Sequence, residues 1–411
     1  MKDLDRRPPP VVLLGTHCLT GLQASRILWR KGVPVIGVSD KVKRAYCRTR
    51  SVKRTIATPE IWDNPIPPLQ EIAAQYEARP VLIPCTDEFV WWLNERRKAI
   101  GEVADFLLPP HDVLELLSDK ARFYRYATEH NLPLPETRIV ATLKELELAS
   151  REMSFPTVLK PPRKSPEWME VSNNLKVLKV ETAEELLQIG KVLLETSHLI
   201  LQDWVRGPET NSRELCVCFD KQSRPLASLF LKKIRQWPPA VGVSSLAVEV
   251  PPDETVSTGL DMLQNLGYAG AGQLEFKKDE ESGKLYIIEM NAGRVALNFP
   301  LCEACGMEMT YTCYCAAAGL PLPEARTITR PGSKWICWKT DLASVYALRR
   351  RGDLTVRDWL RSVRGHKWSA DIQLDDLFPL SLDLIQKSAT LLGRTIRKIM
   401  IQRAPRKTIQ Q

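Results

Sequence analysis

The sequence predicts a multidomain protein of mixed α/β and α+β class. Its 411 residues are too many for one ordinary hydrophobic core, so we expect two to three domains. Strand-like and helix-like runs alternate over about residues 10–110, which is typical of a parallel, doubly wound sheet covered by helices. A second alternating region follows Pro109-Pro110, and the chain from about residue 321 onward is rich in helical patterns. These changes of pattern predict borders near residues 112 and 320.

In the first region, short apolar runs have the composition of buried parallel strands. VVLLG (11–15) and PVIGVSD (34–40) are separated by the helix-like run LQASRILWRKG. A further apolar run, PVLIPCTDE (80–88), precedes the helical pattern FVWWLNERRKAI. The turn GTHCLTG after the first strand lacks the Gly-x-Gly-x-x-Gly spacing of a dinucleotide-binding turn. A dinucleotide cofactor is therefore not expected here.

The second region begins with the helical run DVLELLSDKARFYRYATEHN and continues mainly as strands. Two late strands, QLEFK (273–277) and KLYIIEMN (284–291), are joined by KDEESG, a polar and glycine-containing connection that predicts a β-hairpin. The earlier strand patterns are FPTVLK (155–160), LKVLKV (175–180), HLILQDWV (198–205), ELCVCFD (214–220) and PLASLFLKKI (225–234).

One face of this hairpin carries oxygen-bearing side chains. Because side chains alternate along a strand, Glu289 and Asn291 point the same way, and we expect Glu275 to lie opposite Ile287 on that face. Two carboxylates and an amide oxygen suit Mg²⁺, which shares its ligand shell with phosphates. Arg294, just beyond, has the fork geometry that binds a phosphoryl group. The alternative is an ordinary solvated end of a strand.

Two lysines strengthen the phosphate interpretation. Lys160 ends the strand pattern FPTVLK, and two prolines stop the strand after it. Lys120 lies near the start of a long amphipathic helix. Either lysine alone would usually be a solvated charge. Together with the hairpin they describe a clamp for a nucleoside triphosphate.

The cysteines allow a second metal hypothesis. Cys302-x-x-Cys305 and Cys313-x-Cys315 invite a zinc site, but Cys-x-Cys is a poor spacing, and GMEMTYTCYCAAAG has the pattern of a helix of small apolar residues. The N-terminus MKDLDRRPPP contains no apolar segment of the kind that directs secretion. We therefore expect a cytoplasmic protein with reduced thiols.

The net charge of +9 is concentrated at the end of the chain. Segment 387–407 holds seven Lys or Arg and no acid, with apolar residues near helical spacing. It predicts a basic helix docked on the protein, or alternatively peripheral contact with an anionic membrane. No apolar run approaches the ~20 residues that span a bilayer. Nucleic-acid binding is not expected, because the sequence has no helix-turn-helix, zinc finger or aromatic–basic repeat.

The order of these motifs resembles the ATP-grasp superfamily, specifically its carboxylate–amine ligase-like members. The resemblance spans about residues 80–300 and implies a Rossmann-like pre-ATP-grasp domain (1–112), an ATP-grasp domain (113–320) with a lid at about 136–203, and a helix-rich C-terminal region (321–411). Six stretches in the family's order carry it: LIPCTDE, LLSDKARFYRYATEHNLPLPET, FPTVLKPP, LILQDWVRGPE, KKIRQWPPAVG and GAGQLEFKKDEESGKLYIIEMNAGR.

The resemblance implies a role for each matching residue. ATP phosphates are assigned to Lys120 and Lys160, and the ribose to Glu209. The backbone of the hinge residues Gln202, Asp203, Trp204 and Val205 is assigned to adenine. Mg²⁺, with Mn²⁺ as an alternative, is assigned to Glu275, Glu289 and Asn291. The catalytic residues that face the transferred phosphate and the carboxylate are Arg294, Lys233 and Arg235.

The implied activity is ADP-forming ligation of a small-molecule carboxylate to an amine. Phosphoryl transfer from ATP makes an acyl phosphate, which the amine then attacks, so no protein nucleophile is needed. A small-molecule kinase and a non-catalytic nucleotide-binding module are the alternatives on the same clamp. A homodimer is expected by analogy with the family. Two departures stand out: the lid segment 161–174 contains no glycine, and Ala292-Gly293 stand where a proline often precedes the arginine.

Overall fold

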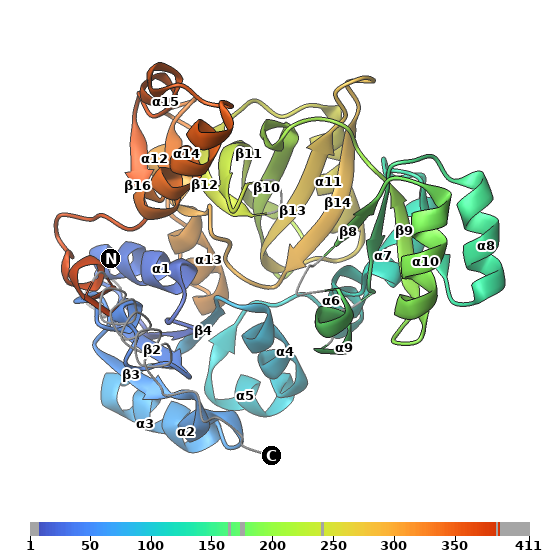
Figure 1. Cartoon of the computed structure of the whole chain (residues 1–411). Coiled ribbons are helices and arrows are strands. Elements are labelled where there is room, and N and C mark those ends of the chain that lie inside the picture. The colour runs from blue at the N-terminus through green and yellow to red at the C-terminus, as the bar shows by residue number, and fades with distance from the viewer. Residues whose placement is uncertain (1–7, 163–165, 173–176, 240–241, 384, 387–411) are drawn as a thin grey trace, which may run out of the picture.

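The computed structural model describes residues 8–162, 166–172, 177–239, 242–383 and 385–386 of the chain (Figure 1). The basic segment 387–407 lies outside the described residues, and so do Asn173 and Asn174 of the lid segment. Among the described helices, none is both long enough and apolar enough to cross a membrane.

The first sheet is parallel, as the alternation of strands and helices predicts. Its strand order is β3-β2-β1-β4-β5, with every registered pair parallel. All residues of β1 are buried, as expected for an inner strand of a sheet whose connections are helices. The elements are β1 (Val11–Leu14), α1 (Leu19–Arg30), β2 (Val35–Ser39), β3 (Arg54–Ala57), α2 (Thr58–Trp62), α3 (Ile66–Tyr76), β4 (Val81–Pro84), α4 (Asp87–Glu95), α5 (Arg97–Val103) and β5 (Asp105–Phe106).

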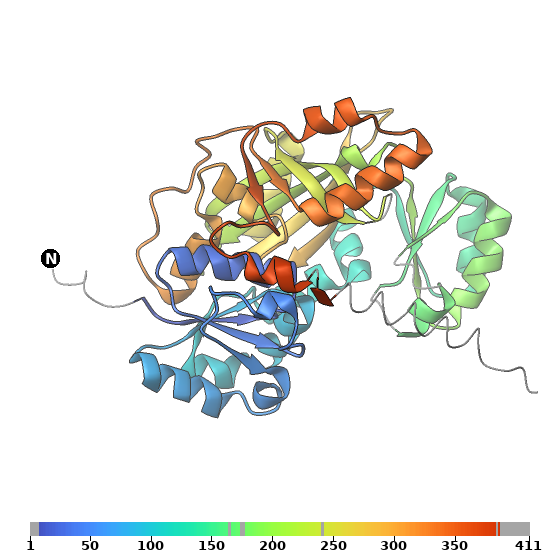
Figure 2. The ribbon, with the colours of Figure 1, turned by 60° about the vertical axis from the view of Figure 1, so that its left-hand side comes forward.

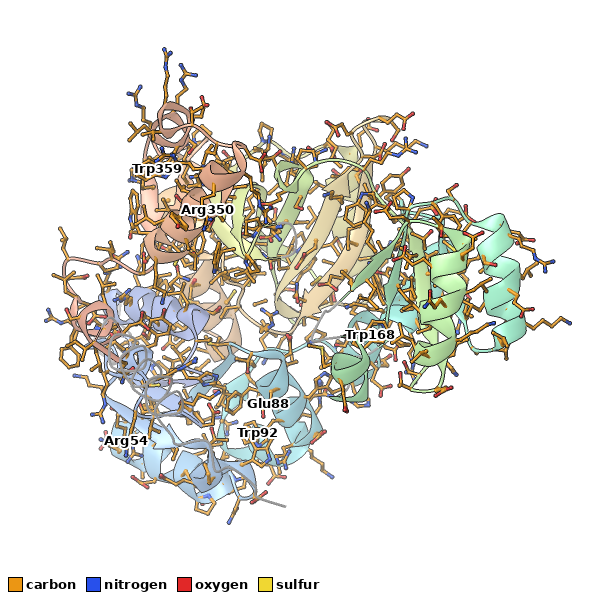
Figure 3. All side chains as sticks on the ribbon, in the orientation of Figure 1. Arg54, Glu88, Trp92, Trp168, Arg350 and Trp359 are labelled. Atoms are coloured by element: carbon orange, nitrogen blue, oxygen red, sulfur yellow. The ribbon has the colours of Figure 1, made fainter. Side chains whose placement is uncertain are left out.

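The expected lid region forms a separate antiparallel sheet on the side of the molecule away from the first sheet (Figure 2). Its order is β6-β9-β7-β8, and its own core includes the fully buried Trp168 (Figure 3). Two helices, α6 (His111–Ser118) and α7 (Lys120–Glu129), precede it. The lid elements are β6 (Thr137–Val140), α8 (Leu143–Glu152), β7 (Thr157–Lys160), α9 (Pro166–Val171), β8 (Leu178–Val180), α10 (Ala183–Leu194) and β9 (Leu199–Asp203).

The third sheet has the order β14-β13-β10-β11-β12-β15-β16 and is antiparallel except for its last pair. The expected hairpin is present as β13 and β14 at one edge of this sheet. The elements are β10 (Ser212–Phe219), β11 (Pro225–Trp237), β12 (Val243–Glu249), α11 (Glu254–Asn265), β13 (Gly270–Lys278), β14 (Leu285–Ala292), α12 (Pro300–Ala304), α13 (Met309–Ala318), β15 (Lys334–Ile336), α14 (Trp338–Arg351), α15 (Val356–Ser362) and β16 (Lys367–Ser369).

The first and third sheets share one hydrophobic core. Val12 and Leu82 of the first sheet belong to the same buried cluster as Leu274 and Ile287 of the third. We propose the division of the chain at about residues 112 and 320, although β15 and β16 of the last region extend the third sheet. This packing holds the ends of β4 and β14 next to each other, which is where the candidate site lies.

The cysteine-rich segment is helical and buried. Cys302 lies on α12, and Cys313 and Cys315 lie on α13, all within the second hydrophobic cluster. All ten cysteines are free thiols. Among the described residues, no three His, Cys, Asp or Glu side chains are grouped as metal ligands would be.

Candidate functional site

The hairpin register brings the two glutamates directly opposite each other. Glu275 pairs with Glu289, and Gln273 pairs with Asn291. The expectation that Glu275 lies opposite Ile287 is therefore wrong. Two shifts cause the difference. The register is off by one, since Lys277 pairs with Tyr286 rather than Leu285, and one extra residue in β14 between the partners of Phe276 and Glu275 adds a second shift, a β-bulge that alternation alone does not reveal.

Asn291 links the carboxylates to Arg294. Its amide nitrogen donates to Glu275 Oε1 at 2.9 Å, and its amide oxygen accepts from Arg294 at 2.9 Å. Arg294 also donates to Asp87 at the start of α4. The N-terminal region therefore contributes Asp87 to the site. In the sequence, the location of Asp87 in the motif LIPCTDE is the one feature that could have suggested this contact.

Lys120 and Lys160 approach from the opposite side. Lys120, the first residue of α7, places Nζ 2.6 Å from Glu289 Oε2. Lys160 ends β7, where its Nζ donates to Gln202 Oε1 at 2.6 Å and to the Tyr124 hydroxyl at 3.3 Å. Sequence reasoning missed Tyr124, although its position four residues after Lys120 places both on one helical face.

The two lysines differ in their charge states. Burial lowers the pKa of Lys160 to about 8, although Glu289 opposes the shift. Burial also lowers the pKa of Lys120, but attraction to Glu289 and the hydrogen bond between them outweigh it and raise the pKa overall. Lys120 is therefore a permanent cation, whereas Lys160 titrates near physiological pH.

A third carboxylate lies beside the hairpin pair. Glu214 on β10 is the registered neighbour of Glu275, is buried, and pairs with Lys233 Nζ at 2.8 Å. Gln273 and Asn298 also donate to Glu214. Burial raises the pKa of Glu275, with the opposing attraction of Lys233 offset in part by repulsion from Glu289 and Glu214. Strands β10, β13 and β14 thus each contribute one glutamate to this cluster. The sequence interpretation missed Glu214.

Lys233 and Arg235 do not lie together. Lys233 Nζ is 3.9 Å from Glu275 Oε2, so it belongs to the carboxylate cluster. The β11–β12 pairing is irregular on both sides of Arg235, and this side chain turns to α14. There it is buried against Asp341, with Nε–Oδ1 at 2.8 Å, and donates to Ser362 at 2.7 Å. The geometry describes a structural ion pair rather than the catalytic contact expected for Arg235.

The hinge residues follow the end of β9. The Gln202 side chain points to Lys160 and also donates to Thr137, so Gln202 acts through its side chain as well as its backbone. The N–H groups of Asp203 and Trp204 donate to backbone carbonyls at 2.9 and 3.2 Å. Glu209 lies in a short 3-10 turn near Lys277. Burial lowers the pKa of Lys277, and the charge of Glu209 opposes part of that shift.

Some of these groups line a cleft between the hairpin, α7 and the first domain. The cleft has a volume of about 290 Å³, and Lys120, Glu289 and Asn291 line it. Asp87 and Trp91 of α4 form its opposite wall. Pro161 and Pro162, at the start of the lid segment, line another side. Of the predicted site residues, Lys120, Glu289 and Asn291 thus line the opening. Glu275 and Arg294 are hydrogen-bonded to Asn291.

The comparisons with known proteins concern the fold and part of the sequence. The family model described as "Carbamoyl-phosphate synthase L chain, ATP binding domain" matches residues 253–325, which include the hairpin. The chain is similar to biotin carboxylase of Campylobacter jejuni, solved with an ATP analogue, at a TM-score of 0.59 and 18% identity over 77% of this chain and 73% of that one. The structural likeness shows a shared fold, and the family model matches one part of the chain.

Two further solved structures are similar in fold. N5-carboxyaminoimidazole ribonucleotide synthetase of Thermus thermophilus matches at a TM-score of 0.57 and 20% identity, over 79% of this chain and 81% of that chain. The biotin carboxylase domain dimer of Hydrogenobacter thermophilus 2-oxoglutarate carboxylase, solved with MgADP and bicarbonate, matches at 0.57 and 18% identity over 79% and 73%.

One curated protein is similar in sequence. It is a D-aspartate ligase of Enterococcus faecium (strain Aus0004), 25% identical over 226 residues, which are 51% of this chain and 52% of the relative. The chain therefore spans about half the length of that relative.

Proposed function

We propose that this chain is an ATP-grasp enzyme, an ATP- and Mg²⁺-dependent ligase that joins a carboxylate to an amine. The observation that carries the proposal is the direct pairing of Glu275 with Glu289 beneath Lys120, with Arg294 at the end of the same strand. A binding module has no need for two acids held against each other, whereas phosphoryl transfer requires a divalent cation.

Glu275, Glu289 and Asn291 would hold Mg²⁺, with Mn²⁺ as the alternative. Their fit follows from their chemistry: three glutamates stand in neighbouring registers, and the pKa of Glu275 is raised by burial and by the adjacent carboxylates. A divalent cation would relieve this repulsion, and oxygen donors are those that Mg²⁺ prefers. When bound, it supplies neutralisation of phosphate charge.

The protein's own cations complete the triphosphate clamp. We assign ATP phosphates to Lys120 and Lys160, adenine to the hinge 202–205 and the ribose to Glu209. Within the hinge, the N–H groups of Asp203 and Trp204 already donate within the protein, so backbone donation to adenine falls to Val205. Tyr124 holds the Lys160 ammonium in place.

Arg294 and Lys233 serve the reacting groups. A carboxylate resists attack by an amine because oxide would have to leave, whereas an acyl phosphate releases phosphate readily. We assign Arg294 to the transferred phosphoryl group, and Lys233 to the substrate carboxylate or its acyl phosphate. We omit Arg235 from these roles because Asp341 neutralises it. The homodimer expected from the family stays a prediction.

The proposal is tested by following ADP and phosphate release with a panel of amino acids and carboxylates. The name of the curated relative makes D-aspartate the first amine to include. We expect release to depend on both substrates and to be lost in Glu289→Gln, which keeps the size of the side chain. Release of ADP with a stable phosphorylated product would instead indicate a kinase, and ATP binding without turnover a binding module. Turnover by Glu289→Gln equal to that of the parent would refute the metal assignment.

A further inference from the structure

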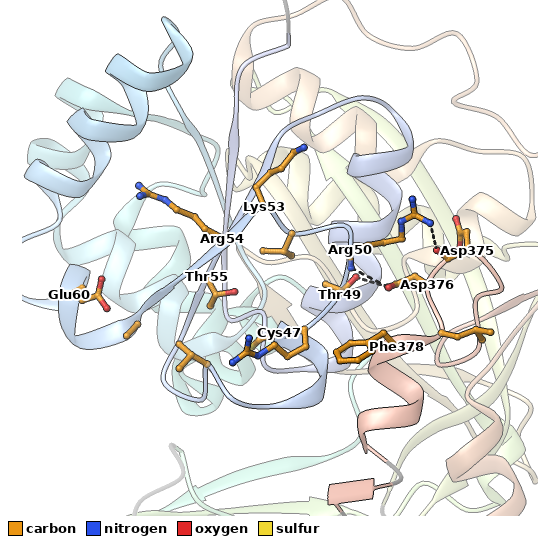
Figure 4. A pocket seen from close by; sticks show the side chains of 15 residues that line it. Cys47, Thr49, Arg50, Lys53, Arg54, Thr55, Glu60, Asp375, Asp376 and Phe378 are labelled. Carbon is orange, nitrogen blue, oxygen red and sulfur yellow. Dashed lines mark hydrogen bonds between the residues drawn. The ribbon is translucent and has the colours of Figure 1, made fainter.

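A second cavity lies along the free edge of the first sheet. Its volume is about 770 Å³, within the range of roughly 300–1,000 Å³ that small-molecule sites occupy. The β2–β3 connection, β3 and the segment 375–378 line it (Figure 4). It shares no lining residue with the ATP cleft. Because β3 and β4 lie on opposite sides of β2 and β1 in the sheet, Arg54 is far from Glu88 beside the cleft (Figure 3).

The wall of this cavity is cationic. Residues 41–54 contain seven Lys or Arg and no acid, and all seven are exposed. Four of them line the cavity: Arg48, Arg50, Lys53 and Arg54. Such a concentration of like charge costs stability through self-repulsion, which a bound anion relieves.

The acids on the facing segment are already neutralised. Asp376 is buried and pairs with Arg26 at 2.8 Å. Asp375 accepts two hydrogen bonds from Arg30, at 2.8 and 2.9 Å. Glu60 on α2 is the remaining acid of the lining. The cavity therefore carries a net positive charge.

Two of the lining cations are available to a ligand. Arg54 pairs with the exposed Glu71, and Arg50 donates to the Asp375 carbonyl and stacks on Trp29 at 4.9 Å. Arg48 and Lys53 make no ion pair with an acid in the part of the chain that the structure describes. These two side chains can bind an anion without breaking an existing pair.

An apolar surface faces these cations. Val42, Val52 and Leu377 contribute to the lining, and Phe378, also in the lining, is 61% exposed. The buried Arg26–Asp376 pair fixes segment 375–378 to α1, so the two walls are held in place before a ligand arrives. A ligand that combines phosphate groups with an apolar or planar part would match both walls.

We propose that this cavity binds a small phosphorylated molecule, with its phosphate groups on Arg48 and Lys53 and its less polar part against Phe378. The chain's own segment 387–411 is a poor occupant, because it carries seven Lys or Arg and no acid. This second site is independent of the proposed ligase reaction, because none of its lining residues belongs to the ATP cleft.

Calorimetric titration of the full chain with inorganic pyrophosphate, in buffer without Mg²⁺, tests this proposal. The background variant is Lys120→Gln, which weakens phosphate binding in the ATP cleft. The test variant adds Arg48→Gln and Lys53→Gln. The matched control adds Lys221→Gln and Lys284→Gln, two exposed lysines that line neither cavity and remove the same charge.

We expect one saturable site in the background and control variants, and an affinity lower by about tenfold or more in the test variant, because two charge-assisted hydrogen bonds are lost. Equal affinity in all three variants, or an equal loss in the control, would overturn the proposal. Sedimentation with phosphatidylserine vesicles is the second measurement. Vesicle binding that needs Arg48 and Lys53, without pyrophosphate binding, would replace the small-molecule proposal by a membrane surface. Because no ATP turnover is measured, the outcome does not depend on the ligase proposal.

Discussion

The affinity for ATP is expected to fall as the pH rises through the pKa of Lys160. Burial lowers this pKa from 10.5 to about 8, so the ammonium is mostly protonated at pH 7 and mostly neutral at pH 9. The sign follows directly, because only the protonated form attracts phosphate. Bound phosphates stabilise that form and raise its pKa, so ATP binding above pH 8 takes up a proton. The protonated fraction changes about tenfold between pH 7 and pH 9, which corresponds to roughly 1.4 kcal/mol of binding free energy.

The assay is the dissociation constant of ATP at constant Mg²⁺ from pH 7 to pH 9, where the phosphates of ATP are almost fully ionised. Two variants bracket the parent. Lys160→Arg keeps its charge over this range and should show a flat profile. Lys160→Gln should bind about as weakly at pH 7 as the parent does at pH 9. The reasoning fails if the parent profile is flat, or if Lys160→Gln keeps the pH dependence.

Three further predictions concern folding, each measured by chemical or thermal unfolding. Arg235→Met should destabilise the protein by about 3–5 kcal/mol, because it leaves Asp341 buried and uncompensated, and adding Asp341→Leu should restore part of the loss; an unchanged stability would contradict the structural role. Gly21→Ala should destabilise, because its Cβ would lie 2.7 Å from the Gly15 carbonyl oxygen, whereas Gly101→Ala, with its nearest neighbour at 3.9 Å in a helix, should stabilise by up to about 1 kcal/mol. Similar effects of the two changes would exclude this steric cause. Burial raises the pKa of Glu303 to about 8, so its contribution to stability is present below the unfolded-state value of 4.5 and lost as the pH rises through 8. Glu303→Gln should remove that loss, and an unchanged pH profile of unfolding would refute it.

Local pattern was enough to predict the elements and their order. The strands at Val11–Leu14, Val35–Ser39 and Val81–Pro84 follow from short apolar runs between helical patterns, and a parallel sheet follows from that alternation. The hairpin of β13 and β14 was likewise predicted from two strand patterns and a polar connection. These features depend on residues close together in the chain, so the sequence alone contains the information.

Long-range packing decided the details of the candidate site. A one-residue difference in hairpin register and one extra residue in β14 together placed Glu289 opposite Glu275, and alternation reveals neither. Glu214 joined the cluster because β10 lies beside β13, although 59 residues separate it from Gln273, which it contacts.

Arg235 was predicted to belong to the site, but long-range packing places it elsewhere. Its sequence context beside Lys233 suggested a shared site, yet its partner Asp341 is 106 residues away. Which charge neutralises another depends on the positions of whole elements in the folded chain. The sequence by itself therefore determined the fold, and the order of its motifs predicted a nucleotide clamp. The tertiary structure alone decided the pairing of its charges, because contacts between distant segments exist only once the sheets and helices have packed.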